Sequence, residues 1–263
     1  MTAEIQISTE LWEATKAYAT KILTEDLPVK YQYHVLSHTE QVVAAVEDIG
    51  RPTGLDTDQI RMIQLAAWLH DLGYVYKYIG HEEESLKIAR KFLEGHQAEE
   101  RLIQRVEELI EATKLEIEPR NTLEAVLKDA DLSNLATEDA LANSDLIRQE
   151  WKIFCQREFT DDEWDRFNFR FFKDHEYYTD YAREKLGPIK DSNRKKIKKN
   201  IRAREKANNK KVDHKELEAT IDDQEKQIDK LKKKLKKEKT NRPERGVETM
   251  FRVTLKNHTT LSQ

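Results

Sequence analysis

The sequence places an adjacent His70-Asp71 pair at the end of an apolar run, residues 65–69. Apolar residues in and before this run recur at the spacing that buries one face of a helix, and Gly73 follows shortly after as a stop. An imidazole beside a carboxylate is costly to bury unless another group uses them, and a divalent metal ion is one such group. The pair alone is weak evidence, so the metal interpretation depends on partners elsewhere in the chain.

Other polar side chains occur at the edges of predicted helices. His34 and His38 are one helical turn apart, so they could converge on one ion, although histidines on helix surfaces are also common. Asp131 lies near the edge of an apolar stripe and is either a metal ligand or a helix-end residue. His81 precedes an acidic first turn that the helix dipole explains without any further function.

His38, His70, Asp71 and Asp131 together form a mixed nitrogen and oxygen ligand set. Such a set suits Mn²⁺, Fe²⁺, Co²⁺, Ni²⁺ or Mg²⁺, and the lack of a thiolate makes it unlike a structural zinc site. A divalent ion with open coordination positions activates water and polarises a phosphoryl oxygen. The chemistry that follows is hydrolysis of a phosphate ester.

The elements that must position these residues are predicted to be helices throughout. Only seven glycines and five prolines interrupt long periodic runs, which argues for an all-α fold. Thr9 is a candidate N-cap of the first helix. The aromatic residues of the last two helices of the body are interpreted as core rather than as a base-stacking platform. The helices are expected at about 9–23, 33–49, 59–71, 82–93, 99–112, 123–132, 141–158 and 162–186.

The net charge of −4 conceals a split between an acidic body and a basic tail. Residues 1–182 contain 20 Lys+Arg and 37 Asp+Glu, whereas residues 183–263 contain 26 and 13. An acidic body does not suit a nucleic-acid backbone, so nucleic acid is not expected as a partner. The single cysteine, Cys155, fits a reducing compartment, and no signal peptide or membrane-spanning run is present, so we expect a cytoplasmic location.

The C-terminal third has its own pattern. We expect a body at 1–189, a basic linker helix at 190–211, a coiled-coil segment at 212–240 and a tail at 241–263. The segment alternates apolar positions by four and three, which favours a parallel two-stranded coiled coil and a homodimer; the alternative is a solvated charged helix. The heptad positions are Leu217, Ile221, Gln224, Ile228, Leu231 and Leu235.

The order and spacing of these motifs resemble the H…HD…D signature of the HD-domain superfamily of metal-dependent phosphohydrolases, over roughly residues 5 to 185. The resemblance implies an HD-domain helical bundle, and the heptad pattern predicts that a C-terminal coiled-coil helix follows it. It also implies that the metal ligands are His38, His70, Asp71 and Asp131.

The segment that starts at Gly80 resembles one that follows the dyad in many small members of this superfamily. By that resemblance, His81 faces the substrate or a second metal ion, and Glu82 assists proton transfer. Tyr74 stands where cyclic-di-GMP-specific relatives carry a lysine, which disfavours that substrate. The dyad also lacks the paired acidic residues of the guanosine-tetraphosphate hydrolases.

Residues 245–258 resemble the segment that precedes the membrane helices in Pycsar effector-like proteins, which are bacterial membrane proteins. This resemblance implies that the chain is the soluble part of a longer, membrane-attached protein.

We therefore predict a metal-dependent phosphohydrolase, a phosphodiesterase or phosphatase, that acts on a nucleotide or cyclic nucleotide through a metal-activated water. The expected catalytic residues are Asp71, His81 and Glu82. The expected substrate-binding residues are His34, Tyr74, Lys114, Arg148 and Lys173. Two alternatives stay open: a non-catalytic nucleotide sensor that signals through the coiled coil, and a nucleic-acid-binding protein that acts through the basic residues 195–204.

Overall fold

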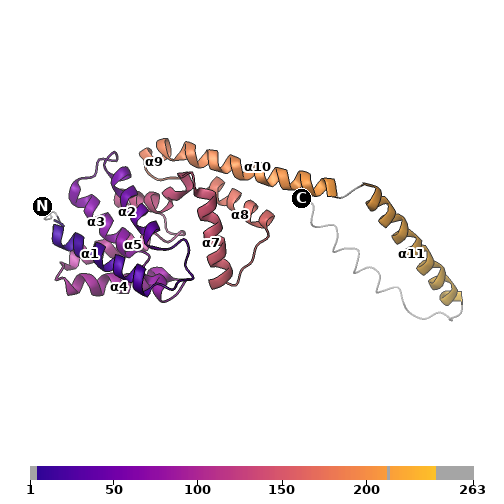
Figure 1. Ribbon diagram of the computed structural model, residues 1–263, viewed down its shortest axis with the longest axis horizontal. Helices are drawn as coiled ribbons and strands as arrows, with labels where there is room; N and C mark the ends of the chain where they lie inside the picture. The colour runs from indigo at the N-terminus through magenta and orange to yellow at the C-terminus, as the bar shows by residue number, and fades with distance from the viewer. Residues whose placement is uncertain (1–4, 212–213, 241–263) are drawn as a thin grey trace. The chain divides into compact units, whose positions relative to one another are not determined.

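The structure is a computed structural model that describes residues 5–211 and 214–240. Over these residues it contains α-helices, short helical turns and no β-strand, which confirms the predicted all-α fold. None of the described helices is both long and apolar enough to cross a membrane. The α-helices, shown in Figure 1, are α1 (Thr9–Lys21), α2 (Leu36–Gly50), α3 (Thr57–Leu69), α4 (His81–Gly95), α5 (Glu100–Ala112), α6 (Thr122–Asp131), α7 (Ala140–Phe154), α8 (Asp161–Asp174), α9 (Asp180–Lys185), α10 (Gly187–Lys211) and α11 (His214–Thr240).

Five of the described helices, α1, α3, α6, α8 and α9, begin after a side chain that accepts a hydrogen bond from the first turn. Asp56 caps α3 in a reciprocal arrangement with Gln59. At α1 the predicted cap was wrong by one position: Ser8 Oγ accepts from the Leu11 N–H at 3.1 Å, and Thr9 is already helical. Ser8 has the extended backbone that a cap needs, which the sequence alone does not distinguish for two adjacent hydroxyl residues.

Helix α3 is the centre of the main core and packs against α1, α2, α5 and α6. Its residues from Leu65 to Leu69 are all buried, so the helix has apolar contacts on every side rather than on one stripe. Each fully buried leucine or isoleucine contributes about 1.5–3 kcal/mol. The C-terminal end of α3, where His70 and Asp71 follow, therefore lies inside the protein.

A second, smaller core joins α7, α8 and α10. It is formed by Leu135, Ala140, Phe172, Ile197 and Ile201. In Figure 1, α7 and α8 lie beside the group of helices α1–α6. Helices α7 and α8 thus pack beside the main core and belong to a separate, smaller core.

The single helix predicted at about 162–186 is wrong, because the structure divides it into α8 and α9. The buried carboxylate of Asp129 accepts hydrogen bonds from the backbone N–H groups of Tyr178 and Thr179, at 2.8 and 2.7 Å. Thr179 in turn caps α9. This contact over about 50 residues of sequence holds the chain in a turn where the local pattern alone predicts helix.

The described residues fall into two units that divide between Arg204 and Glu205. The first part of α10 belongs to the body, since Asn193, Ile197 and Ile201 are buried there. The segment expected to be a linker thus begins inside the first unit. Helix α11 covers most of the predicted coiled-coil segment, whereas residues 212–213 and the predicted tail 241–263, with the 245–258 segment, lie outside the described residues.

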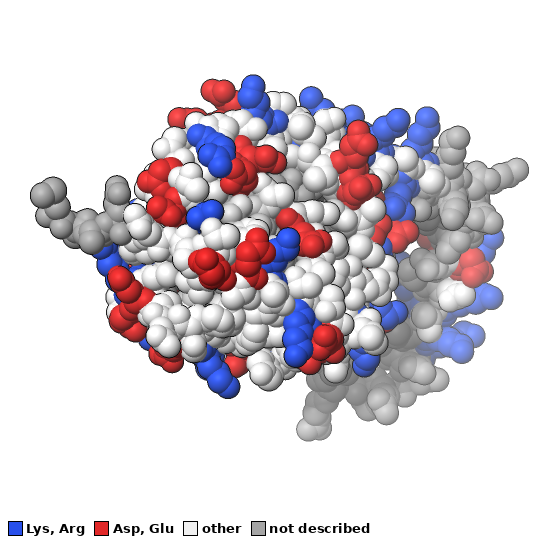
Figure 2. Space-filling model, turned by 60° about the vertical axis from the view of Figure 1, so that its left-hand side comes forward, with Lys and Arg blue, Asp and Glu red and all other residues white. Residues whose placement is uncertain are grey.

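Acidic and basic side chains lie close together on the face shown in Figure 2. Many such neighbours in the described body are ion pairs; Arg90, for example, pairs with Glu94, Glu100 and Glu107. Exposed pairs of this kind contribute at most about 1 kcal/mol each. On this face, acidic side chains are therefore interspersed with basic ones.

Candidate metal centre

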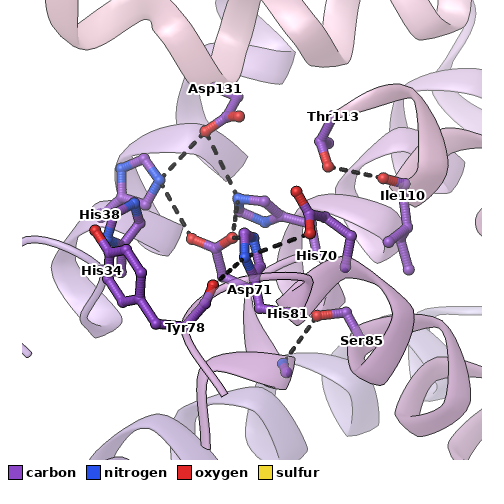
Figure 3. A network of polar contacts seen from close by, with 12 residues as sticks. His34, His38, His70, Asp71, Tyr78, His81, Ser85, Ile110, Thr113 and Asp131 are labelled. Atoms are coloured by element: carbon purple, nitrogen blue, oxygen red, sulfur yellow. Dashed lines mark hydrogen bonds and ion pairs between the residues drawn. The ribbon is translucent and has the colours of Figure 1, made fainter. Parts of the chain in front are cut away.

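The structure brings His38, His70, Asp71 and Asp131 together from three helices. His70 and Asp71 follow α3 directly, His38 lies in the first turn of α2, and Asp131 is the last residue of α6. Helix α2 packs against both α3 and α6, which is how residues about 90 positions apart in the sequence meet. Figure 3 shows the four side chains converging on one point.

Their ligand atoms lie at nearly equal separations. His38 Nε2 is 3.5 Å from Asp71 Oδ2 and 3.3 Å from Asp131 Oδ1. His70 Nε2 is 3.2 Å from Asp71 Oδ1 and 3.6 Å from Asp131 Oδ1. Two ligands about 2.0–2.2 Å from one ion are separated by roughly 3.0–3.5 Å, so the four side chains fit a single divalent cation. His38, His70 and Asp71 are buried and have ligand atoms that all lie within 4.8 Å of one another, and Asp131 contacts this group through the two histidines.

The hydrogen bond that His70 makes through one ring nitrogen leaves the other nitrogen available to bind a metal ion. Its Nδ1–H donates to the carbonyl oxygen of Ala67 at 2.7 Å, so in the neutral ring the lone pair is on Nε2. Neither this Nε2 atom nor Asp71 Oδ2 has a hydrogen-bond partner, although both are buried. Unpartnered buried polar atoms are expensive, and a cation between them removes that cost.

The electrostatics of the cluster favour a cation. Burial lowers the pKa of the His70 imidazole, but Asp71 and Asp131 outweigh this effect and raise it well above its ordinary value. Burial raises the pKa of Asp71, yet His70 and His81 hold it well below its ordinary value. The Asp71 carboxylate is therefore ionised, and without a metal the His70 imidazole takes up a proton that a divalent ion would displace.

Beside the cluster, His81 begins α4 and contacts Asp71. Its Nε2 is 3.4 Å from Asp71 Oδ1, and its Nδ1 is 3.2 Å from the carbonyl oxygen of Tyr78 and 3.5 Å from Glu82 Oε2. Burial lowers the pKa of His81, but Asp71 and Glu82 raise it overall. His81 and Glu82 are thus in contact with each other beside the predicted ligand Asp71.

His34 was expected on the same helical face as His38, and this was wrong because α2 begins only at Leu36. The His34 ring nevertheless lies near the site, with its centroid 5.8 Å from that of His38. Its Nδ1 contacts Oε2 of Glu150, a fully buried residue of α7 that sequence reasoning missed. No local signal marks Glu150, because it is one of several charged residues in α7, with Asp145, Arg148 and Lys152.

A cavity of about 460 Å³ opens over the cluster. Its lining includes the predicted ligands, the three expected catalytic residues and two of the expected substrate-binding residues. These are His34, His38, His70, Asp71, Tyr74, His81, Glu82 and Asp131.

The other three expected substrate-binding residues are absent from this lining as far as the described residues define it. Lys114 pairs with Glu83 at 3.1 Å. Arg148 pairs with Asp161 at 2.9 Å and lines a separate pocket. Lys173 is exposed near the end of α8. The spacing of residues in the sequence does not show which acidic side chain a lysine or arginine will pair with in the fold.

The fold and the site define an all-helical protein with a buried histidine and carboxylate centre suited to a divalent metal. Residues 35–133 match the family model of the HD domain, and this part of the chain is an HD domain. The match spans all four predicted ligands. A comparison with curated proteins finds no match.

Two solved structures are similar to this chain to different degrees. A protein from Lactobacillus plantarum is 13% identical, with a TM-score of 0.59 over 77% of this chain and 100% of that chain, so it shares the fold. A predicted HD superfamily hydrolase from an uncultured Thermotogales bacterium is 19% identical, with a TM-score of 0.42 over 60% of this chain and 91% of that chain.

Proposed function

We propose that the protein is a metal-dependent phosphohydrolase that acts on a nucleotide or cyclic nucleotide. The observation that carries this proposal is the convergence of His38, His70, Asp71 and Asp131 at one side of a cavity large enough for an organic ligand. The HD domain supports the hydrolase class. A divalent ion held there supplies positive charge that acidifies water and polarises a phosphoryl oxygen.

The protein's own side chains have distinct tasks in this reaction. Asp71 orients the attacking water, and His81 holds the Asp71 carboxylate through the 3.4 Å contact. His34 presents Nε2 to the cavity, because Nδ1 is engaged by Glu150, and donates a proton to the leaving oxygen. Glu82, beside His81, accepts the proton that water releases.

The charge of the cavity limits the phosphate group that it accepts. Among the described lining residues there is no lysine or arginine, so only the metal ion and the histidines offset substrate charge. A polyphosphate needs several cationic partners, whereas a phosphodiester or a monophosphate needs few. We therefore favour a monophosphate or a cyclic phosphate over a nucleoside triphosphate.

The test is hydrolysis of nucleoside mono-, cyclic mono-, di- and triphosphates in Mn²⁺, with and without a chelator. We expect turnover of a monophosphate or cyclic phosphate that the chelator abolishes and that His70→Ala lacks. His96→Ala is the matched control, since His96 is exposed on the far end of α4. Nucleotide binding without turnover would contradict the proposal and support the non-catalytic sensor.

We also propose that the protein is a homodimer through α11. Ile228 and Leu231 occupy predicted seam positions, and they are 49% and 59% exposed in the single chain. Apolar side chains exposed on a charged helix at heptad spacing suit a second copy of the same helix.

A further inference from the structure

The cavity extends well beyond the space that a phosphate group fills. Its far end is lined by aromatic side chains of α7 and α8, outside the segment that matches the HD domain. These residues are Trp151, Trp164, Phe167, Phe171 and Phe172. At about 460 Å³ the whole cavity has the volume of a site for an organic molecule. The far end therefore receives the part of a ligand that does not react.

Two tyrosines near the metal centre, Tyr74 and Tyr78, are themselves packed against other rings. The ring of Tyr74 lies between His81, at a centroid distance of 3.7 Å, and His34, at 4.4 Å. Tyr78 stacks on Phe154 at 5.0 Å. Both faces of Tyr74 and one face of Tyr78 are therefore already in contact with other rings.

The aromatic end also contains polar atoms that lack partners. Asn134 Oδ1, Ser144 Oγ and Trp164 Nε1 are buried without a hydrogen bond, and all three residues line the cavity. Their exposed fractions are 8%, 9% and 3%. An indole N–H is a donor, an amide oxygen is an acceptor and a hydroxyl can be either. Leaving them unpaired costs free energy that a ligand with matching groups would recover.

We propose that this end of the cavity binds a planar heteroaromatic ring with donors and acceptors on its edge, of the nucleobase class. The proposal rests on the proposed function, because it places the base of the substrate whose phosphate is at the metal centre. Aromatic side chains stack on any such ring. An alkyl chain would fill the same volume but would leave Asn134, Ser144 and Trp164 without partners.

Binding of free nucleosides tests the site without any reaction. Adenosine, guanosine, cytidine and uridine are titrated calorimetrically into the full chain with a chelator present. We expect at least one to bind, and Ser144→Ala and Trp164→Phe each to weaken it about 5- to 10-fold, the effect of one lost hydrogen bond. The matched controls are Ser192→Ala, on the exposed side of α10, and Trp12→Phe, on α1.

Activity on two substrates separates this proposal from the proposed function. With phenyl phosphate, whose ring carries no donor or acceptor on its edge, both variants should lose less kcat/KM than they do with the best nucleotide. With the best nucleotide, KM should rise about 5- to 10-fold while kcat stays within about 2-fold. Nucleosides that fail to bind, or variants that bind them as tightly as the unaltered protein, would overturn the base site even if the metal-dependent hydrolysis stands.

Discussion

The Nδ1 atom of His34 lies 2.5 Å from Oε2 of Glu150, a contact that joins residues 116 positions apart. The other carboxylate oxygen of Glu150 accepts backbone N–H groups from Gln32, Tyr33 and His34, at 2.7, 2.7 and 3.1 Å. Burial raises the pKa of Glu150, but these hydrogen bonds, led by that of His34, lower it overall, so the carboxylate stays ionised. One side chain of α7 thus fixes both the loop before α2 and the imidazole at the cavity.

Replacing Glu150 with glutamine should slow the reaction more than it harms the fold. Glu150→Gln keeps an acceptor for the backbone N–H groups but removes the charge beside His34. We expect kcat to fall roughly 10- to 100-fold, with a smaller change in KM, because the change weakens proton donation by His34 rather than substrate binding. Steady-state kinetics and thermal unfolding measure both effects. Glu138→Gln, an exposed change, is the control, and an unchanged kcat in Glu150→Gln would remove His34 as the proton donor.

Gly73 is required for the approach of α4 to the dyad. A Cβ atom at position 73 would lie 1.9 Å from the carbonyl oxygen of His81, and the Gly73 N–H donates to the buried Ser85 Oγ at 2.8 Å. Gly73→Ala must therefore push the start of α4 away from the metal centre. We expect a loss of at least about 3 kcal/mol in the free energy of unfolding, together with loss of metal binding.

The control for this change is Gly95→Ala. A Cβ atom at Gly95 meets nothing within 4 Å, and alanine in a helix is favoured over glycine by up to about 1 kcal/mol. Denaturant unfolding of both variants, with metal content, makes the comparison. A Gly73→Ala protein as stable and as metal-loaded as Gly95→Ala would mean that the close approach is not needed.

Much of the site is readable from the sequence because its ligands sit where helices end. The apolar run before His70 predicts a buried helix, and its end fixes the dyad. In the 129–131 stretch, however, pattern alone does not separate Asp129 from Asp131. The structure shows that Asp129 instead binds the turn at Tyr178 and Thr179 and that Asp131 reaches the cluster.

Other features could not be predicted because they depend on contacts between distant segments. Glu150 looks like any glutamate of a charged helix until His34 is placed against it. Lys114 and Arg148 are cations that could bind a phosphate group as far as the sequence shows. In the fold, however, neighbouring carboxylates pair with them. Pairing of this kind is decided by tertiary packing, and no local pattern encodes it.

The fold should lose stability at mildly acidic pH through His175. Burial and the nearby charges of Lys190 and Lys128 lower the pKa of His175 from 6.5 to about 4. Because the folded pKa lies below the unfolded one, stability is complete above pH 6.5 and falls as the pH drops towards 4. At pH 4 the free energy of unfolding should be about 3 kcal/mol lower than at neutral pH.

Denaturant unfolding between pH 7 and pH 4, with a chelator present to separate this effect from metal release, measures the loss. Over this pH range the free energy of unfolding of His175→Gln should fall by about 3 kcal/mol less than that of the unaltered protein. His96→Gln, at an exposed position, should follow the unaltered protein. Identical pH curves for all three proteins would show that His175 is not held neutral by the fold.

The proposed dimer depends on the apolar seam of α11. The double change Ile228→Lys and Leu231→Lys should convert a particle of twice the chain mass, which is 31.0 kDa, into a monomer. Buried lysines at seam positions would have to be desolvated. Light scattering after size exclusion gives the mass, and Gln227→Lys, at an exposed position, is the control. An unaltered protein that is monomeric at all concentrations would exclude this dimer.

The central claim is that His38, His70, Asp71 and Asp131 hold one divalent ion between them. The most direct measurement is the metal content of the purified chain, by mass spectrometry after dialysis against Mn²⁺ and then against metal-free buffer. We predict about one equivalent in the unaltered protein and in His96→Ala, and less than a tenth of that in His70→Ala and in Asp131→Ala. A full equivalent retained by the variant that lacks both His70 and Asp71 would contradict the account.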